Sequence, residues 1–146
     1  MAMTDDSAAS VSTVRDQPEG APPSQPVVML AVRFVLELIA FGSIGVAGWT
    51  LGDGGIFGGV LAAIAVVTAA AAWGTLAVPD DPTRNPKAAI AVPGWLRLVI
   101  ELSIFGLAAW SLWVYVSRAA SETFLTAIGI MMLVGWDRIW WMLRRR

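Results

Sequence analysis

The stretch Arg33–Gly42, RFVLELIAFG, decides the fold of this chain. It places one arginine and one glutamate inside an apolar run long enough to cross a bilayer, where charged side chains are expensive. The same frame, R-x-x-x-E-L-x-x-F-G, returns at Arg97–Gly106, RLVIELSIFG, with every matched residue 64 positions later. We therefore expect a tandem repeat in which each copy carries one intramembrane Arg–Glu pair.

Composition places the chain among integral membrane proteins. Of its 146 residues, 57% are apolar and 14% are charged, and the mean hydropathy is +0.68. A soluble domain carries about 25% charged residues. Four apolar runs are each long enough, at about 1.5 Å per residue, to cross a hydrocarbon core of about 30 Å. We therefore predict an all-α membrane protein with four transmembrane helices, at about residues 29–51, 56–78, 95–116 and 121–143.

Three parts are expected along the chain. Residues 1–26 are small and polar, with acids where a signal peptide would be basic, and are predicted to be a disordered cytoplasmic tail. Residues 27–143 form the four-helix transmembrane domain, in which each repeat copy supplies two spans and hence one helical hairpin. Residues 144–146, three arginines, form a basic cytoplasmic end.

The basic residues predict the orientation. If the amino terminus is cytoplasmic, nine of the ten Lys and Arg residues lie at or near that side, and Arg118 lies at the other. This asymmetry follows the positive-inside rule. We therefore expect a multi-pass protein of the cell membrane, with both termini and the loop of residues 79–94 in the cytoplasm.

Six charged residues are predicted to share one layer near the cytoplasmic ends of the spans. Within each repeat copy the arginine and the glutamate are four residues apart, so they share a helix face. The fourth span adds an acid and a base at a similar depth, and the formal charges cancel. The candidate cluster is Arg33, Glu37, Arg97, Glu101, Asp137 and Arg138. The repeat also permits crossed pairs, Arg33 with Glu101 and Arg97 with Glu37.

Two interpretations of this cluster compete. In one, a neutral polar layer fixes the helix register while the arginines reach toward the headgroups. In the other, the cluster handles protons or ions, since charged residues inside a membrane mark functional sites by default. Each glutamate has an arginine within reach, which favours the ionised carboxylate and hence the first interpretation.

The residue types exclude several chemistries. The chain has no Cys and no His, which removes thiolate, disulfide and histidine-based acid–base chemistry. The sequence holds no nucleophile–base constellation, phosphate loop or metal-ligand set, so we expect no enzyme activity, no catalytic residues, no metal and no cofactor. The net charge of −1 implies no nucleic-acid partner.

Small residues and tryptophans add two expectations. Gly58, Ala62 and Gly74 lie at multiples of four residues in the second span and are predicted to line a close helix contact. The eight tryptophans lie toward the ends of the spans. They are predicted to form interfacial belts, and the alternative is a ligand-binding aromatic cage.

The motifs between residues 73 and 106 resemble those of the YrdB-like family, which are small prokaryotic membrane proteins classed as a domain of unknown function. The positions that carry the resemblance are Trp73, Gly74, Pro79, Pro93, Arg97, Glu101, Phe105 and Gly106. It covers roughly residues 29–143, whereas the acidic tail and the Trp-rich fourth span depart from the pattern. The resemblance implies a four-helix membrane fold and no particular activity.

These observations lead to an expected function. We expect a small integral membrane protein, without enzymatic activity, that acts as an accessory or structural protein through helix–helix association. Its partners would be the lipid bilayer and either a second copy of the chain or another membrane protein. The alternative is a small solute or proton-coupled transporter with Glu37, Glu101 and Asp137 in its path.

Overall fold

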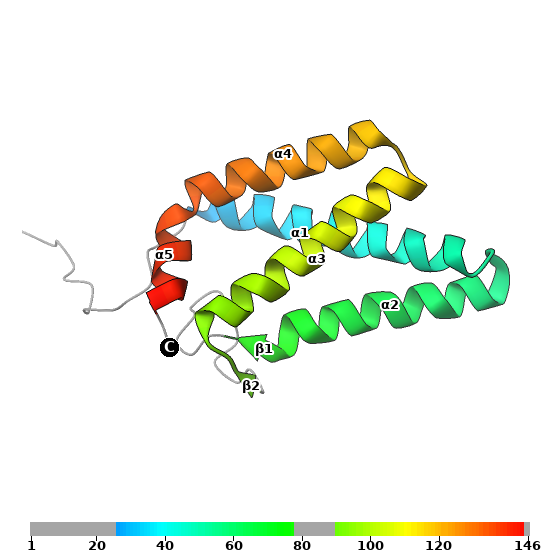
Figure 1. Cartoon of the computed structure of the whole chain (residues 1–146), viewed down its shortest axis with the longest axis horizontal. Helices are drawn as coiled ribbons and strands as arrows, with labels where there is room; N and C mark the ends of the chain where they lie inside the picture. Colours follow the sequence, from blue (N-terminus) through cyan, green and yellow to red (C-terminus); the bar gives the residue numbers. More distant parts are fainter. Residues whose placement is uncertain (1–25, 78–89, 145–146) are drawn as a thin grey trace, which may run out of the picture.

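The computed structural model describes residues 26–77 and 90–144, and these form a bundle of helices (Figure 1). The helices are α1 (Val27–Leu51), α2 (Gly55–Thr75), α3 (Gly94–Tyr115), α4 (Arg118–Val134) and α5 (Trp136–Arg144). Two short strands, β1 (Leu76–Ala77) and β2 (Ile90–Ala91), pair in parallel between the end of α2 and the start of α3. The predicted all-helical class is confirmed. The predicted tail, apart from Pro26, lies outside the described residues, as do residues 79–89 of the predicted loop.

Three of the helices are long and apolar enough to cross a membrane. These are α1 with 25 residues, α2 with 21 and α3 with 22. At about 1.5 Å per residue, each exceeds the roughly 30 Å of a hydrocarbon core. They match the first three predicted spans within a few residues at each end. α2 ends at Thr75, three residues before the predicted end of the second span, because Leu76 and Ala77 form β1 and pair with β2.

Glycines allow α1 and α2 to approach each other closely. A Cβ added at Gly48 would lie 2.6 Å from the Cα of Ala62, and one added at Gly52 would lie 2.5 Å from the Cα of Gly58. Backbone therefore contacts backbone at these positions, and a larger residue would separate the helices. The predicted contact at Gly58 and Ala62 is confirmed. Within this chain the prediction for Gly74 is wrong, because a Cβ there would meet nothing within 4 Å.

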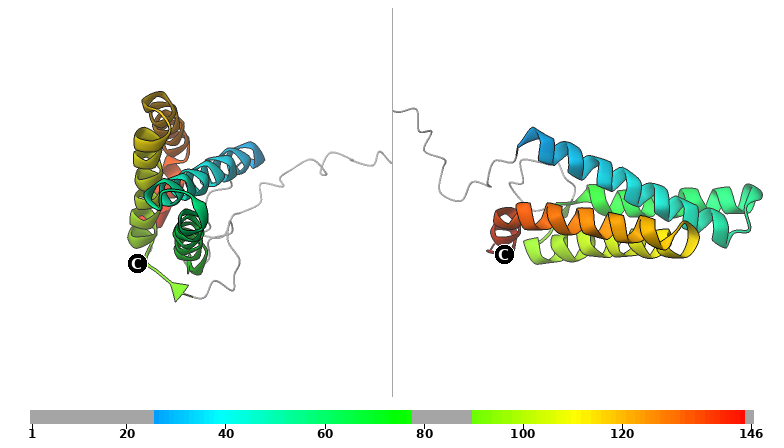
Figure 2. Two further views of the ribbon diagram at one scale, coloured as in Figure 1. Left: turned by 90° about the vertical axis from the view of Figure 1, so that its right-hand side faces the viewer. Right: turned by 90° about the horizontal axis from the view of Figure 1, so that it is seen from above.

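The fourth predicted span, residues 121–143, is not one continuous helix. It is divided at Gly135, where α4 ends and α5 turns across the end of the bundle toward the start of α3 (Figures 1 and 2). The Gly135 N–H donates to the Met131 carbonyl, and its own carbonyl accepts from the Arg138 N–H, which starts the new helix. Glycine disfavours a helix interior by about 1 kcal/mol relative to alanine, and Asp137 suits a helix N-terminus.

The buried core lies between α1, α3 and α4. It is built from small and apolar residues, among them Ala40, Phe105, Ala108 and Ile128. Two buried serines join the helices through hydrogen bonds to backbone, from Ser111 to the Ser43 carbonyl and from Ser121 to the Ala109 carbonyl. α2 packs mainly on α1 and contributes few buried residues. One long side of α2 is therefore uncovered.

Candidate functional site

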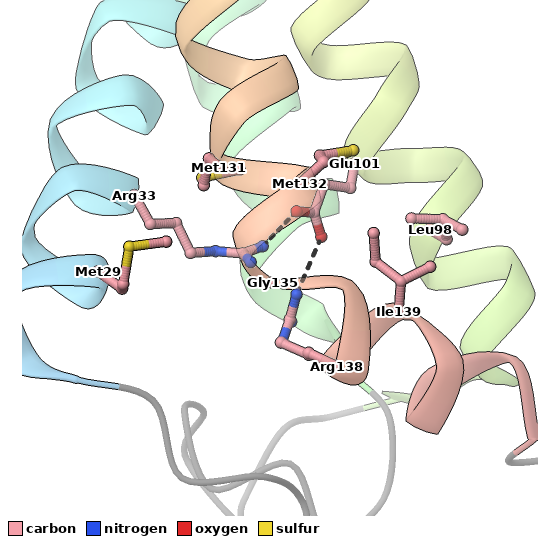
Figure 3. Close-up of a pocket in the computed structure, with 9 residues that line it drawn as sticks. All are labelled: Met29, Arg33, Leu98, Glu101, Met131, Met132, Gly135, Arg138 and Ile139. Atoms are coloured by element: carbon pink, nitrogen blue, oxygen red, sulfur yellow. Dashed lines mark hydrogen bonds and ion pairs between the residues drawn. The ribbon is translucent and has the colours of Figure 1, made fainter.

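Glu101 is the centre of a buried charge cluster. It projects from α3 with only 1% of its surface exposed. Arg33 of α1 donates from Nη2 to Glu101 Oε1 across 2.6 Å. Arg138 of α5 approaches from the other side, with Nη1 3.7 Å from Glu101 Oε2 (Figure 3). One carboxylate on α3 thus contacts arginines of α1 and α5. The contact with Arg33 is a hydrogen bond between ionised groups, which is the stronger kind, and the contact with Arg138 is an ion pair.

Arg33 also bonds to the glutamate of its own repeat copy. Its Nε donates to Glu37 Oε1 across 3.1 Å, one helical turn away. The two glutamates differ in burial, since the Glu37 side chain is 17% exposed and the Glu101 side chain 2%. One of the two predicted crossed pairs, Arg33 with Glu101, is present. Arg33 thus bridges the carboxylates of Glu37 and Glu101.

Arg97 occupies a different environment from its repeat equivalent. It is almost fully buried, and its guanidinium carbon lies 3.9 Å from the centroid of the Trp73 ring. Arg33 approaches the same ring at 5.6 Å. Such stacking of a guanidinium on an indole face is favourable, more so when it is shielded from water. The cluster therefore has an aromatic wall as well as two carboxylates.

Trp73 belongs to the charge cluster, although the sequence does not predict this. It was predicted to belong to an interfacial belt, but it is buried and packs against Phe105, with ring centroids 6.0 Å apart. The signal that could have found it is the W-G-x-x-x-x-P motif at the end of the second span, which contains Trp73 itself. Composition alone could not distinguish Trp73, because the interfacial belt explains the other seven tryptophans equally well.

Asp137 does not join the cluster, contrary to the prediction. It is exposed on α5, and no ion pair links it to Arg33, Arg97 or Arg138 within the part of the chain that the structure describes. The break at Gly135 gives α5 a new direction, which turns Arg138 inward and Asp137 outward. The described cluster therefore holds three arginines and two glutamates, rather than three of each.

A small cavity of about 20 Å³ lies beside Glu101. Three charged side chains and several apolar ones line it (Figure 3): Arg33, Glu101 and Arg138 with Met29, Leu98, Met131, Met132, Gly135 and Ile139. A cavity of this volume has room for about one water molecule. Glu101 Oε2, which makes no hydrogen bond to the described residues, is the acceptor that such a water would find.

Comparisons with known proteins place the chain in a family. A family model described as "Protein of unknown function (DUF2568)" matches residues 31–140, a range that contains all six predicted cluster residues. The chain is 37% identical over 116 residues to the "Uncharacterized protein YrdB" of Bacillus subtilis (strain 168), which covers 80% of this chain and 94% of that protein. No solved structure matches the chain. The predicted resemblance is confirmed, and the chain belongs to the YrdB-like DUF2568 family of proteins of unknown function.

Proposed function

We propose that this protein is a non-enzymatic integral membrane protein with four spans, which acts through helix–helix association as an accessory subunit or small homo-oligomer. The three long apolar helices support the membrane location. α4 has 17 residues, about 26 Å, which is slightly short for a span. It leads back from the far end of α3 to the end where α3 begins (Figure 1), which supports a fourth crossing.

The proposed orientation has both termini in the cytoplasm, with the two hairpins inserted in the same direction. The cytoplasmic end of the bundle is then the one at which α1 and α3 begin and α5 lies (Figure 1), near Arg33, Arg97 and Arg138. Arg118, the first residue of α4, lies at the other end. The distribution of basic residues along the whole sequence supports this orientation.

The observation that carries the association proposal is the uncovered side of α2. Only 6% of its most apolar window is buried, compared with 33% for α3. The exposed positions Val60, Ile64, Val67, Ala71 and Gly74 are separated by alternate steps of four and three residues, so they form one continuous stripe. Ala71 and Gly74, the small residues near the carboxyl-terminal end of α2, would let a second helix approach closely.

The experiment uses the absence of cysteine from the chain. Val67 is 66% exposed and lies in the middle of the stripe. A protein with the single substitution Val67→Cys should therefore form a cross-linked product within native membranes. A product of twice the mass identifies a second copy, and another mass identifies a different membrane protein. Adding Gly74→Leu should abolish the product without unfolding the protein, because a Cβ at Gly74 meets nothing within 4 Å.

Two matched controls separate the stripe from exposed surface in general. Gly106 on α3 and Gly129 on α4 are also exposed, and a Cβ at either meets nothing within 4 Å. Leucine at these positions should leave the cross-link intact. If Val67→Cys fails to cross-link while Leu107→Cys on α3 succeeds, the association surface lies elsewhere and the α2 proposal is wrong.

The transporter alternative requires a wet path through the charge cluster. The cavity beside Glu101 has about 20 Å³, room for about one water molecule, and Glu101 itself is almost completely buried. These features support a closed cluster that fixes the positions of the helices. Reconstituted vesicles test the alternative, since a proton-coupled carrier would lose flux on Glu101→Gln while its stability stayed unchanged.

A further inference from the structure

α5 carries an exposed aromatic stripe. Trp136, Trp140 and Leu143 recur at helical spacing, so they share one face of this nine-residue helix. They are 52%, 48% and 46% exposed, and the two indole rings contact edge to face with centroids 6.2 Å apart. An exposed stripe of large apolar side chains points to an interaction surface.

The opposite face of α5 is held by the bundle. Arg138 is buried and reaches Glu101 Oε2, and Ile139 lines the same cavity as Leu98 of α3 (Figure 3). These contacts fix the rotation of α5 about its own axis. The tryptophan stripe is therefore kept turned away from the charge cluster.

The position of α5 matches that of an interfacial helix. It lies across the end of the bundle instead of continuing along it, at the end where α1 and α3 begin and α2 finishes (Figures 1 and 2). If the long helices cross a bilayer, their ends lie near the headgroups, and α5 lies with them. Tryptophan favours this depth because its ring is apolar and its N–H is polar.

Positive charge borders the stripe. The Arg144 guanidinium carbon lies 5.4 Å from the centroid of the Trp140 ring. The sequence continues with Arg145 and Arg146, and Asp137 is the single acid in residues 136–146. Consecutive basic residues beside an aromatic face attract acidic phospholipids, because the phosphates neutralise them while the rings enter the boundary of the acyl chains.

We propose that α5, which ends at Arg144, forms a docking surface for acidic phospholipid headgroups of the leaflet at this end of the bundle. Trp136, Trp140 and Leu143 enter the lipid, and Arg144 binds phosphate beside the Trp140 ring. The buried contact between Arg138 and Glu101 sets the angle at which this surface meets the membrane. The inference requires that the protein is embedded in a bilayer, but it does not depend on the α2 association surface.

The test uses the full-length chain with Leu143→Cys labelled by bimane. The protein is reconstituted into vesicles that contain phosphatidylcholine and phosphatidylglycerol, with the acyl chains of one lipid brominated at a time. Brominated phosphatidylglycerol should quench the label at least about twofold more strongly than brominated phosphatidylcholine. High salt, or the triple change R144Q, R145Q and R146Q, should remove this preference, whereas Asp137→Asn should increase it.

A bimane label on Leu107→Cys, which is exposed on α3, is the matched control and should be quenched equally by both lipids. If Leu107→Cys is quenched and Leu143→Cys is not, α5 faces water or protein and the proposal is wrong. Equal quenching of Leu143→Cys by both lipids would also overturn it, because α5 would then be an apolar anchor without preference for acidic lipid. Absence of quenching at both positions would instead contradict the membrane location itself.

Discussion

Arg33 on α1 donates to Glu101 on α3 across 2.6 Å, so the arginine of the first R-x-x-x-E motif is bonded to the glutamate of the second. The same guanidinium holds Glu37 through Nε. Arg33 is thus the shared partner of a partly buried carboxylate, Glu37, and an almost completely buried one, Glu101. The difference in burial between these two carboxylates makes the cluster testable by substitution.

Glu101→Gln should destabilise the protein strongly. It removes the carboxylate that faces Arg33 and Arg138, and an uncompensated buried charge costs about 3–5 kcal/mol. Glu37→Gln is the matched control, and it should cost about 1 kcal/mol or less because Glu37 is partly solvated and adjacent on the same helix. Thermal unfolding in detergent measures both.

A double-mutant cycle checks the cause of this difference. Adding Arg33→Gln to Glu101→Gln should restore part of the lost stability, since one stranded charge is then removed. The coupling energy for Arg33 with Glu101 should be about 1 kcal/mol or more and should exceed that for Arg33 with Glu37. A fully stable Glu101→Gln with no coupling would contradict the structural role of the cluster.

Gly48→Ala should weaken the contact between α1 and α2. The new Cβ would lie 2.6 Å from the Cα of Ala62, so one helix must move, at a cost of about 1–3 kcal/mol. Gly42→Ala on the same helix is the control. It meets nothing within 4 Å and should be neutral or stabilising by about 0.5–1 kcal/mol. Equal effects of the two changes on unfolding in detergent would show that α1 and α2 are not in close contact.

Among the tryptophans, substitution of Trp73 should lower the stability of the protein most. Trp73→Leu removes the surface on which Arg97 stacks and leaves space beside Phe105, which should cost about 2 kcal/mol or more. Trp73→Phe keeps an aromatic face and should cost less. Trp95→Leu is the control, since Trp95 is 56% exposed, and it should have little effect on stability. Similar losses at Trp73 and Trp95 would argue against the stacking.

The long helices could be predicted from the sequence, but their partners could not. Uninterrupted apolar runs indicate α1, α2 and α3 directly, because length and hydropathy are properties of a single segment. The spacing of Arg33 and Glu37 likewise fixes a local pair. Whether Arg33 also reaches Glu101 depends on how α1 packs on α3, which two equivalent repeat motifs leave open.

The wrong placement of Asp137 has a local cause. One glycine, Gly135, divides the last predicted span, and glycine is common inside membrane helices, so its presence alone does not indicate a break. Asp137 and Arg138 are neighbours, and in any helix they point about 100° apart. The direction of α5 therefore decides which of them faces Glu101, and that direction is set by packing against α3.

The proposed orientation predicts which positions an impermeant thiol reagent reaches in whole cells. Asp53→Cys in the turn before α2 and Ala119→Cys in the exposed first turn of α4 should be labelled from outside. Arg84→Cys, which lies outside the described residues, should be labelled only after permeabilisation. The reason is the retention of basic segments on the cytoplasmic side during insertion. Permeabilised cells, in which all three should react, control for reactivity. Labelling of Arg84→Cys but not Asp53→Cys in intact cells would show that the orientation is the reverse of the proposed one. α5 would then lie at the outer leaflet.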